Sequence, residues 1–430
     1  MTAEAAAESG TVAFDADELW GPARIVNKAG AVTGSVTGRH YPRLELDALV
    51  ARARRRTGLT DLGAEWDREA AGQLVRSLDA EAGLTTIGRR LARGSVLGDL
   101  EVRLRLTEAY RRQPSVLDRS IDRPLFIINL PRSGATLLQF LLARSPDIRS
   151  LWAWEALDPA TSADAVPTGA PDAGGDGRTG VRRRTGRRHR VIARLVPGYH
   201  DLHPMEADEP EECNALLGHA FDALDVATIF DVPSYLDRWL LGDHLVSYRE
   251  MKAQVQLLQG DEPPRHWFLR TPAHLFALDA IYATFPDACI VQIHRDPGAT
   301  VTSFCSLAAT IRRANSTGRD PARLGPRWTE VWAQGMDRAM AARHRAPATT
   351  SFVDVAYEQL VGDPVATVAR VLEAIDADPG VIDVDALDAR VRAGRQGRRH
   401  VYEPAWFGID PDALRERFAP YIEQFDVRIH

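Results

Sequence analysis

Residues 123–143, RPLFIINLPRSGATLLQFLLA, decide the fold that we predict for this chain of 430 residues. Leu125–Leu130 is almost entirely aliphatic, as expected of a parallel strand that is buried on both faces. A tight loop, Pro131–Thr136, follows, and leucines then recur at helical spacing over 137–142. A strand that enters a helix through such a loop directs free backbone N–H groups and the positive end of the helix dipole to one point. This arrangement favours an anion, typically phosphate.

The loop lacks two parts of a nucleotide-hydrolysing P-loop. Such a loop follows the pattern G-x-x-x-x-G-K-[ST], with its lysine on the β- and γ-phosphates and its hydroxyl on magnesium. Here Gly134 is the one loop glycine, and no lysine follows it. Arg132, Ser133 and Thr136 instead offer a guanidinium and two hydroxyls, which suit oxyanion recognition. The sequence therefore predicts an anion site that is poorly built for ATP and magnesium.

The composition argues against several classes of protein. A formal net charge of −6 does not suit a general nucleic-acid binder. The three cysteines are widely spaced and include no C-x-x-C pair, so we expect neither a disulfide framework nor a zinc site. The acidic N-terminus lacks the order of a signal peptide, and no apolar run approaches the length that crosses a membrane. We therefore expect a cytoplasmic protein.

Strand and helix patterns alternate along the chain, which predicts an α/β fold in three layers with a central parallel sheet and extensive helical additions. The expected strands are Leu125–Leu130, Trp267–Leu269, Cys289–Arg295 and Ser351–Val355.

A loosely ordered N-terminus (1–44) is expected to precede one domain that runs from residue 45 to residue 430. Within this domain we expect three regions outside the sheet. They are a helical arm (45–122), a flexible basic linker (158–190) and a helical substrate-binding region (191–260).

A second strand–helix joint carries another candidate anion site. The strand ends in H-R-D-P, His294–Pro297, so Arg295 stands at the carboxyl end of a parallel strand, where ligands bind in such sheets. Ser303 follows two helical turns later and can face the same anion. An Arg-x₇-Ser pattern is weak alone, but with the first loop it predicts two neighbouring anion sites.

These two motifs together resemble those of sulfotransferases that use 3′-phosphoadenosine 5′-phosphosulfate (PAPS). The resemblance extends through FLRTPAHLFALDAIYATFPDACIVQIHRDP (268–297), FVDVAYEQLVGDP (352–364) and a tail, GRRHVYEPAWFGID (397–410), that is similar to a bacterial subgroup of these enzymes. The sequence departs from the family pattern twice. Ala135 stands where threonine is commoner, and Arg270 stands where lysine is commoner.

The resemblance implies a role for each motif. The amides and side chains of the first loop would hold the 5′-phosphosulfate, with Arg132, Ser133, Gly134, Ala135, Thr136 and Leu137 as its residues. Arg295 and Ser303 would bind the 3′-phosphate, and Arg398 or His400 in the glycine- and arginine-rich tail would close over it. Arg270 would reach the bridging oxygen or the sulfuryl group. PAPS would be the cosubstrate, adenosine 3′,5′-bisphosphate the product, and no metal would be needed.

A general base should take the proton of the acceptor, and three candidates remain open. Glu155 lies just past the loop helix, at about the distance where several sulfotransferase branches place a glutamate. His203 is the second, because cytosolic sulfotransferases use a histidine. Glu206 or Glu209, in the same segment as His203, is the third.

We therefore predict transfer of a sulfuryl group from PAPS to a hydroxyl or amine of a small-molecule or carrier-bound acceptor. A nucleotide-dependent kinase of related fold and a non-catalytic nucleotide-binding protein are the alternatives. The expected partner is the acceptor, with neither nucleic acid nor stable membrane insertion, and a homodimer is left open.

Overall fold

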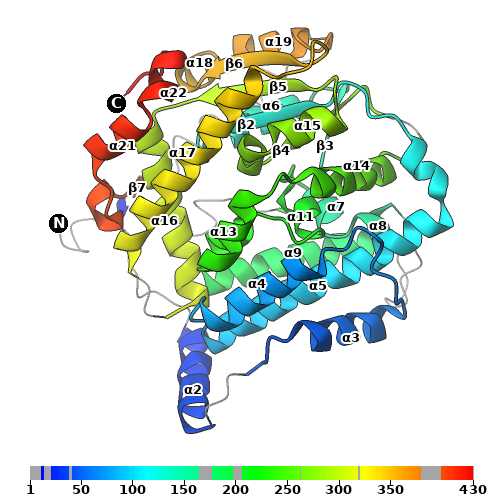
Figure 1. Ribbon diagram of the computed structural model, residues 1–430, viewed down its shortest axis with the longest axis vertical. Helices are drawn as coiled ribbons and strands as arrows, with labels where there is room; N and C mark the ends of the chain where they lie inside the picture. The colour runs from blue at the N-terminus through cyan, green and yellow to red at the C-terminus, as the bar shows by residue number, and fades with distance from the viewer. Residues whose placement is uncertain are drawn as a thin grey trace.

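A five-stranded parallel sheet lies in the upper part of the molecule as Figure 1 shows it. The structure is a computed structural model, and the part of the chain that it describes comprises residues 11–13, 21–37, 41–163, 177–196, 206–261, 263–317, 320–378 and 399–429. The strand order is β3-β4-β2-β5-β6, and each neighbouring pair is parallel. The bounds are Leu125–Asn129 (β2), Ile148–Ser150 (β3), His266–Arg270 (β4), Cys289–His294 (β5) and Ser351–Ala356 (β6). The predicted α/β class is confirmed, and the carboxyl ends of all five strands meet at one edge.

Both faces of the sheet are covered, which explains why its central strands are apolar throughout. Leu125 and Ile127 of β2 belong to one hydrophobic cluster, and Phe126 and Ile128 belong to another. Successive side chains of a strand point to opposite faces, so both faces of β2 are buried. The first cluster includes residues of α6 (Ala135–Leu142), α18 (Tyr357–Gly362) and α19 (Pro364–Glu373). The second includes residues of α14 (Leu245–Gln259), α15 (Leu278–Thr284) and α17 (Leu324–Arg343).

The helices that precede β2 lie at the end of the molecule away from the sheet (Figure 1). They are α2 (Gly21–Thr37), α3 (Leu46–Thr57), α4 (Arg68–Ala80) and α5 (Thr86–Arg112), followed by the short η1 (Pro114–Asp118). The predicted arm is thus helical. Helix α2 differs from the loosely ordered N-terminus that we expected, because Ala23 is buried in a cluster with Leu195 and Val196.

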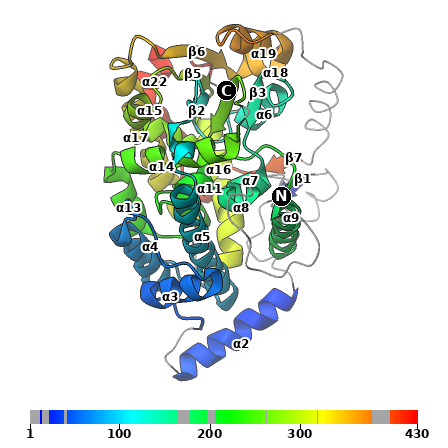
Figure 2. The same cartoon turned by 90° about the vertical axis from the view of Figure 1, so that its right-hand side faces the viewer.

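Residues 158–190 also differ from their prediction as a flexible linker. Two helices, α8 (Pro159–Ser162) and α9 (Gly177–Leu195), lie in or extend from this segment. Val181, Thr185 and His189 are buried at helical spacing, and the arginines between them are exposed. The basic run therefore forms an amphipathic helix, and the prediction is wrong for 177–190. Figure 2 shows α9 beside α7 (Ala153–Leu157) and α8.

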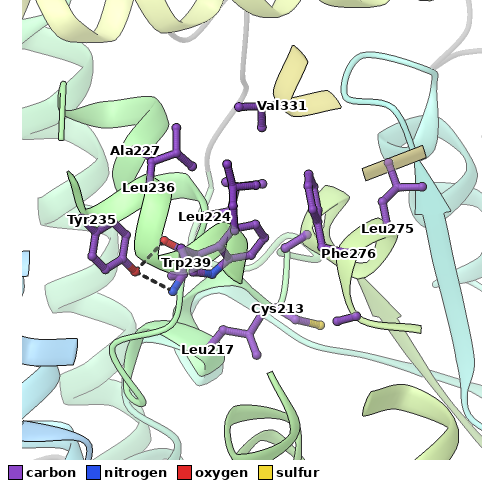
Figure 3. Packing of buried hydrophobic residues seen from close by; sticks show 14 of the residues in the cluster. Cys213, Leu217, Leu224, Ala227, Tyr235, Leu236, Trp239, Leu275, Phe276 and Val331 are labelled. Carbon is purple, nitrogen blue, oxygen red and sulfur yellow. Dashed lines mark hydrogen bonds between the residues drawn. The ribbon is translucent and has the colours of Figure 1, made fainter. Parts of the chain in front are cut away.

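A layer of short helices follows in 206–261, where we predicted a helical region. Its members before α14 are α11 (Asn214–Gly218), α12 (Asp225–Ile229) and α13 (Pro233–Leu241). Figure 3 shows Trp239 of α13 and Leu224, the residue before α12, packed toward Phe276 of η2 (Pro272–Phe276). This packing fixes the helical layer against the segment that leaves β4.

The C-terminal part returns to the edge of the sheet near β5. Helix α16 (Pro297–Asn315) leads away from β5, and α21 (Pro411–Arg417) and α22 (Ala419–Gln424) pack close to α16 and α17. A second parallel sheet joins β1 (Thr11–Ala13) to β7 (Arg399–Val401). The remaining short helices are η3 (Pro321–Arg323) and η5 (Pro404–Phe407). Within the described ranges, no helix is both long enough and apolar enough to span a bilayer.

Candidate active site

The loop after β2 adopts the tight conformation that its sequence predicts. Arg132 has a φ of 66° and Gly134 has a φ of 90°, both in the left-handed region. Glycine tolerates this region because it has no Cβ. A Cβ on Gly134 would also lie 3.2 Å from Cδ2 of Leu360 and 3.3 Å from the Tyr357 ring. Both the backbone conformation and the space therefore call for glycine, and the chain turns directly into α6.

The two predicted anion motifs meet at this loop. The Arg132 Nε donates a hydrogen bond to the Ser303 Oγ at 3.2 Å. The Arg295 guanidinium donates to the backbone carbonyl of Arg132 and lies 3.8 Å from the centre of the Tyr357 ring. Residues 160 or more positions apart in sequence thus form one cationic cluster, as the spacing of the motifs predicted.

Arg270 joins the cluster from the end of β4. Its Nη1 donates to the Thr136 Oγ1 at 3.0 Å, and its Nη2 lies 3.1 Å from the Glu212 Oε1. The Arg270 Nε and the Ser133 Oγ are buried, and neither has a hydrogen-bond partner in the described chain. Buried donors without partners are costly, and an anionic group bound at the loop would satisfy them. The donor set therefore fits a phosphosulfate.

One member of the predicted loop set is already engaged. The N–H of Leu137 donates to the carbonyl oxygen of Gly134 at 2.9 Å. It therefore serves the first turn of α6, whereas the N–H groups nearer the start of a helix have no intrahelical acceptor. The amides from Ser133 to Thr136 are better placed to bind an anion.

Contacts with the C-terminal helices hold Arg295 in place. Its backbone N–H donates to the Tyr421 Oη at 3.2 Å. The preceding residue, His294, stacks on Phe425 with ring centres 4.2 Å apart and lies 2.8 Å from Asp354. Burial alone would raise the pKa of Asp354, but hydrogen bonds from His294 and Arg343 hold it well below its usual value. These contacts fix the strand end that presents the guanidinium.

A cavity of about 750 Å³ opens at the cationic cluster. At one end it is lined by the loop, Arg270, Arg295 and Tyr357. From there it extends past Glu211 and Glu212 into the helical layer, between α5, α9, α11 and α12. A volume of this size holds a ligand as well as a reacting group, and pockets of 300–1,000 Å³ are usual for small molecules.

Glu155 does not reach this cavity. It lines a separate hollow with Arg149, Trp152 and Trp154. Its Oε1 lies 2.6 Å from Arg149, and its Oε2 accepts the backbone N–H of Trp152 at 3.1 Å. The side chain thus caps α7 and neutralises an arginine, which are structural tasks.

The other predicted base candidates also lie apart from the cationic cluster. Glu206 and Glu209 are absent from the lining of the cavity. His203 and Arg398 lie outside the described residues. Glu211 and Glu212, which our sequence analysis did not select, do line the cavity. Glu212 is brought there because the N–H of Cys213 bonds to the Arg270 carbonyl at 2.8 Å, a contact with no signal in the sequence.

Metal ligands do not gather at this site. In the ranges that the structure describes, no group of three or more His, Cys, Asp or Glu side chains is arranged to hold a metal ion. The chemistry available here is that of guanidinium, hydroxyl, amide and carboxylate groups around a cavity.

This fold is that of a sulfotransferase. A sequence model of the sulfotransferase family matches residues 124–379, which is more than half of the chain, and the protein belongs to that family.

Solved structures agree with this assignment. The chain is similar to the sulfotransferase STF1 from Mycobacterium tuberculosis H37Rv, with 31% identity and a TM-score of 0.73 over 88% of this chain and 99% of that one. It shares the fold of the sulfotransferase STF9 from Mycobacterium avium, with 24% identity and a TM-score of 0.75 over 91% of this chain and 99% of that one. No curated protein matches it in sequence.

Proposed function

We propose that this protein transfers a sulfuryl group from PAPS to a hydroxyl or amine of a small-molecule or carrier-bound acceptor. Arg132 and the amides from Ser133 to Thr136 hold the 5′-phosphosulfate, and Arg295 with Ser303 binds the 3′-phosphate. The bond between Arg132 and Ser303 supports this division, because it couples the two anion sites directly. Arg398 would add to the 3′-phosphate site from the tail.

The chemistry follows from these positions. The bond between the sulfuryl sulfur and the phosphate oxygen breaks while a bond to the acceptor oxygen forms in line with it. Negative charge develops on the leaving phosphate, and cationic groups that are already in place stabilise such charge in the transition state. Arg270 supports this role because it is 5% exposed and is held by Thr136 and Glu212. We propose that the reaction needs no metal.

We infer that Glu212 takes the proton of the acceptor. Its carboxylate lies beside Arg270 at the cavity wall, between the cationic cluster and the helical lobe. The Asn214 Nδ2 donates to its Oε2 at 2.7 Å, which orients the group. A carboxylate oxygen accepts more than one hydrogen bond, so Glu212 can also accept the hydroxyl of an acceptor. Glu155 was one of three candidates for this role, but Glu212 lines the cavity and Glu155 lines a separate hollow.

The coupled Arg132, Ser303 and Arg295 cluster without a P-loop lysine is the observation that carries this proposal. The test is release of adenosine 3′,5′-bisphosphate from PAPS in the presence of chelator, with a panel of alcohols, phenols and amines. We expect release that depends on an acceptor. Tight binding of adenosine 3′,5′-bisphosphate without transfer to any member would favour a non-catalytic nucleotide-binding protein instead.

Location and assembly complete the proposal. We propose that the enzyme works in the cytoplasm and that its partner is a small-molecule acceptor. Cell fractionation tests the location, and light scattering at micromolar concentration tests whether two copies associate.

A further inference from the structure

The part of the cavity away from the cationic cluster has a different chemistry. We call this part the helical lobe, and define it by lining residues of α5, α9, α11 and α12 together with the turn between α11 and α12. Aliphatic side chains such as Val96, Val102 and Leu224 form much of its wall. Polar side chains interrupt that wall. They include the acceptors Asp99, His219 and Asp225 and the cations Arg105, Arg184 and Arg188.

His219 presents a single lone pair to the lobe. The residue is 2% exposed, and burial lowers the pKa of its imidazole to about 4, so the ring is neutral. Its Nδ1 lies 2.8 Å from the Gln254 Oε1. The Gln254 Nε2 donates to backbone carbonyls of Leu216 and Glu250, so its oxygen is the acceptor and the Nδ1 of His219 carries the hydrogen.

The other nitrogen of His219 is consequently an acceptor. No hydrogen bond to the Nε2 occurs in the described chain, and this atom is not among the polar atoms that are fully enclosed without a partner. Because His219 lines the cavity, the accessible Nε2 faces the lobe. A neutral imidazole with its Nδ1–H fixed offers a lone pair and no proton at this position.

Asp99 and Asp225 add two carboxylates from opposite walls. Asp99 lies in the middle of α5, and Asp225 lies in the first turn of α12. No hydrogen bond or ion pair within the described chain involves the Asp99 side chain. The Asp225 carboxylate accepts one hydrogen bond, from the backbone N–H of Val226. Burial raises the pKa of Asp99 to about 7, with Arg188 opposing and Asp225 reinforcing the shift. Burial likewise raises the pKa of Asp225 to about 6.

The charged side chains around Asp99 and Asp225 do not fully neutralise these two carboxylates. Arg188 on α9 interacts electrostatically with both carboxylates, and Glu211 and Glu212, in the segment before α11, interact with Asp225. Arg105 also lines the lobe, but it is paired with Asp158 at 2.9 Å. A mid-helix carboxylate that faces a cavity without a partner costs stability, and Asp99 has no structural task to offset that cost.

The turn that carries Asp225 is held firmly. The Tyr235 hydroxyl accepts the N–H of Ala223 at 3.0 Å and lies 3.0 Å from the Ala223 carbonyl oxygen (Figure 3). Arg103 anchors the other side of the turn, since its Nη1 donates to the His219 carbonyl at 3.3 Å. His219 and Asp225 therefore stand at fixed positions, as a preorganised binding site requires.

We propose that the helical lobe binds a hydrogen-bond-donating group of the acceptor, either an ammonium or a set of hydroxyls, through the His219 Nε2 and the carboxylates of Asp99 and Asp225. The proposal rests on the proposed function, because it makes the lobe the acceptor end of the sulfuryl-transfer site. Aliphatic wall residues accommodate the chain between this polar end and the reacting hydroxyl. An unsubstituted alkyl alcohol leaves the His219 Nε2 and the Asp99 carboxylate without hydrogen-bond donors, so it binds less well than an alcohol with a distal donor.

Matched acceptors test this inference. We would compare n-alkanols, α,ω-alkanediols and ω-amino-alkanols of three to eight carbons, measuring both transfer from PAPS and calorimetric binding to the protein with adenosine 3′,5′-bisphosphate. At the chain length that spans the cavity, we expect kcat/KM and affinity to favour the diol or amino-alkanol over the n-alkanol by about tenfold. The Asp99→Leu plus Asp225→Leu variant removes both carboxylate acceptors, so it should lose most of that preference and keep its affinity for adenosine 3′,5′-bisphosphate.

The pH profile separates the two donor chemistries. A cation binds best when both carboxylates are ionised, so affinity for the amino-alkanol should rise between pH 5.5 and 8, whereas affinity for the diol should change little. The exposed Asp412→Asn substitution on α21 is the matched control and should leave the preference unchanged.

Two results would overturn the inference. They are equal affinity for all three series at every length, and a donor preference that survives in the double variant. The calorimetric comparison reports on the lobe even if no sulfuryl transfer occurs, and loss of transfer with adenosine 3′,5′-bisphosphate binding intact would overturn the proposed function alone.

Discussion

The charged side chains at the two ends of the cavity differ in how many partners they have within the protein. At the cationic end, Arg132 bonds to Ser303, and Arg270 bonds to Thr136 and Glu212. In the helical lobe, Asp99 has no hydrogen bond within the described chain, and Asp225 accepts only the backbone N–H of Val226. Burial raises the pKa of both carboxyl groups. The difference indicates that the first end is braced to hold a highly charged donor. In the helical lobe, the polar groups can accept hydrogen bonds from a ligand that binds there.

The largest effect should come from Arg270 at the cationic end. Arg270→Ala removes the group that meets developing charge and leaves the Glu212 carboxylate without its partner. We expect kcat to fall by about 10³-fold. Steady-state kinetics with saturating PAPS measure this.

The lysine variant is the control for this position. Arg270→Lys keeps the charge and should retain activity within about tenfold of wild type. Equal activity of the alanine variant and wild type would contradict this account, because Arg270 and the cationic cluster would then have no role in the reaction.

Substitutions at two glutamates test which residue is the general base. Glu212→Gln should lower kcat by about 10²-fold, because the amide cannot take a proton. Glu155→Gln should leave kcat of the folded enzyme nearly unchanged and lower the free energy of unfolding by about 1–3 kcal/mol, because a charged hydrogen bond to Arg149 is weakened. Urea denaturation and turnover measure the two effects separately. The reverse pattern would return the base to Glu155.

The free energy of unfolding should fall as pH rises because of Asp99. An aspartate with a raised pKa in the folded protein resists ionisation, so its cost is small near pH 4 and grows as pH rises through about 7. Asp99→Asn should therefore raise the free energy of unfolding by about 1–2 kcal/mol at pH 8 and by less at pH 5. Denaturant melts at the two pH values measure this. A destabilised variant would show that Asp99 has a structural partner.

The smallest effect should come from Asp354, which lies near the cationic end. Its contribution to stability should change with pH in the opposite direction to that of Asp99. The pKa of Asp354 lies below its unfolded value, so its contribution is present above about pH 4 and is lost as pH falls further. Asp354→Asn should lower the free energy of unfolding by about 1 kcal/mol at pH 7, with a smaller loss at pH 3. Melts across this range measure the change. A loss that does not depend on pH would assign Asp354 a purely steric role.

The cationic end was predictable because its residues come directly after strands in the sequence. The run Leu125–Leu130 and the motif around Arg295 each encode a strand, a turn and a helix locally, and parallel strands bring their carboxyl ends together. Contacts then place Arg270 and Ser303 beside the first loop as expected. Strand β3, Ile148–Ser150, was missed because three residues carry no measurable alternation.

The helical lobe was not predictable from the sequence. Asp99, His219 and Asp225 lie on separate elements, and nothing in their local sequence distinguishes them from solvated residues. Glu155 was chosen for its distance along the chain from the loop, but its bonds to Arg149 and to the backbone of Trp152 place it in another hollow. The basic run on α9 was taken for a linker because its composition outweighed the spacing of Val181, Thr185 and His189.

Thermal unfolding with two nucleotides tests the central claim, a clamp for two anions without a P-loop lysine. At about 100 times its Kd, adenosine 3′,5′-bisphosphate should stabilise the protein by about 2.7 kcal/mol and raise the Tm by a few degrees. Arg295→Ala should remove most of that shift, and ATP with magnesium should produce little. Stabilisation by ATP with magnesium and none by adenosine 3′,5′-bisphosphate would contradict the account.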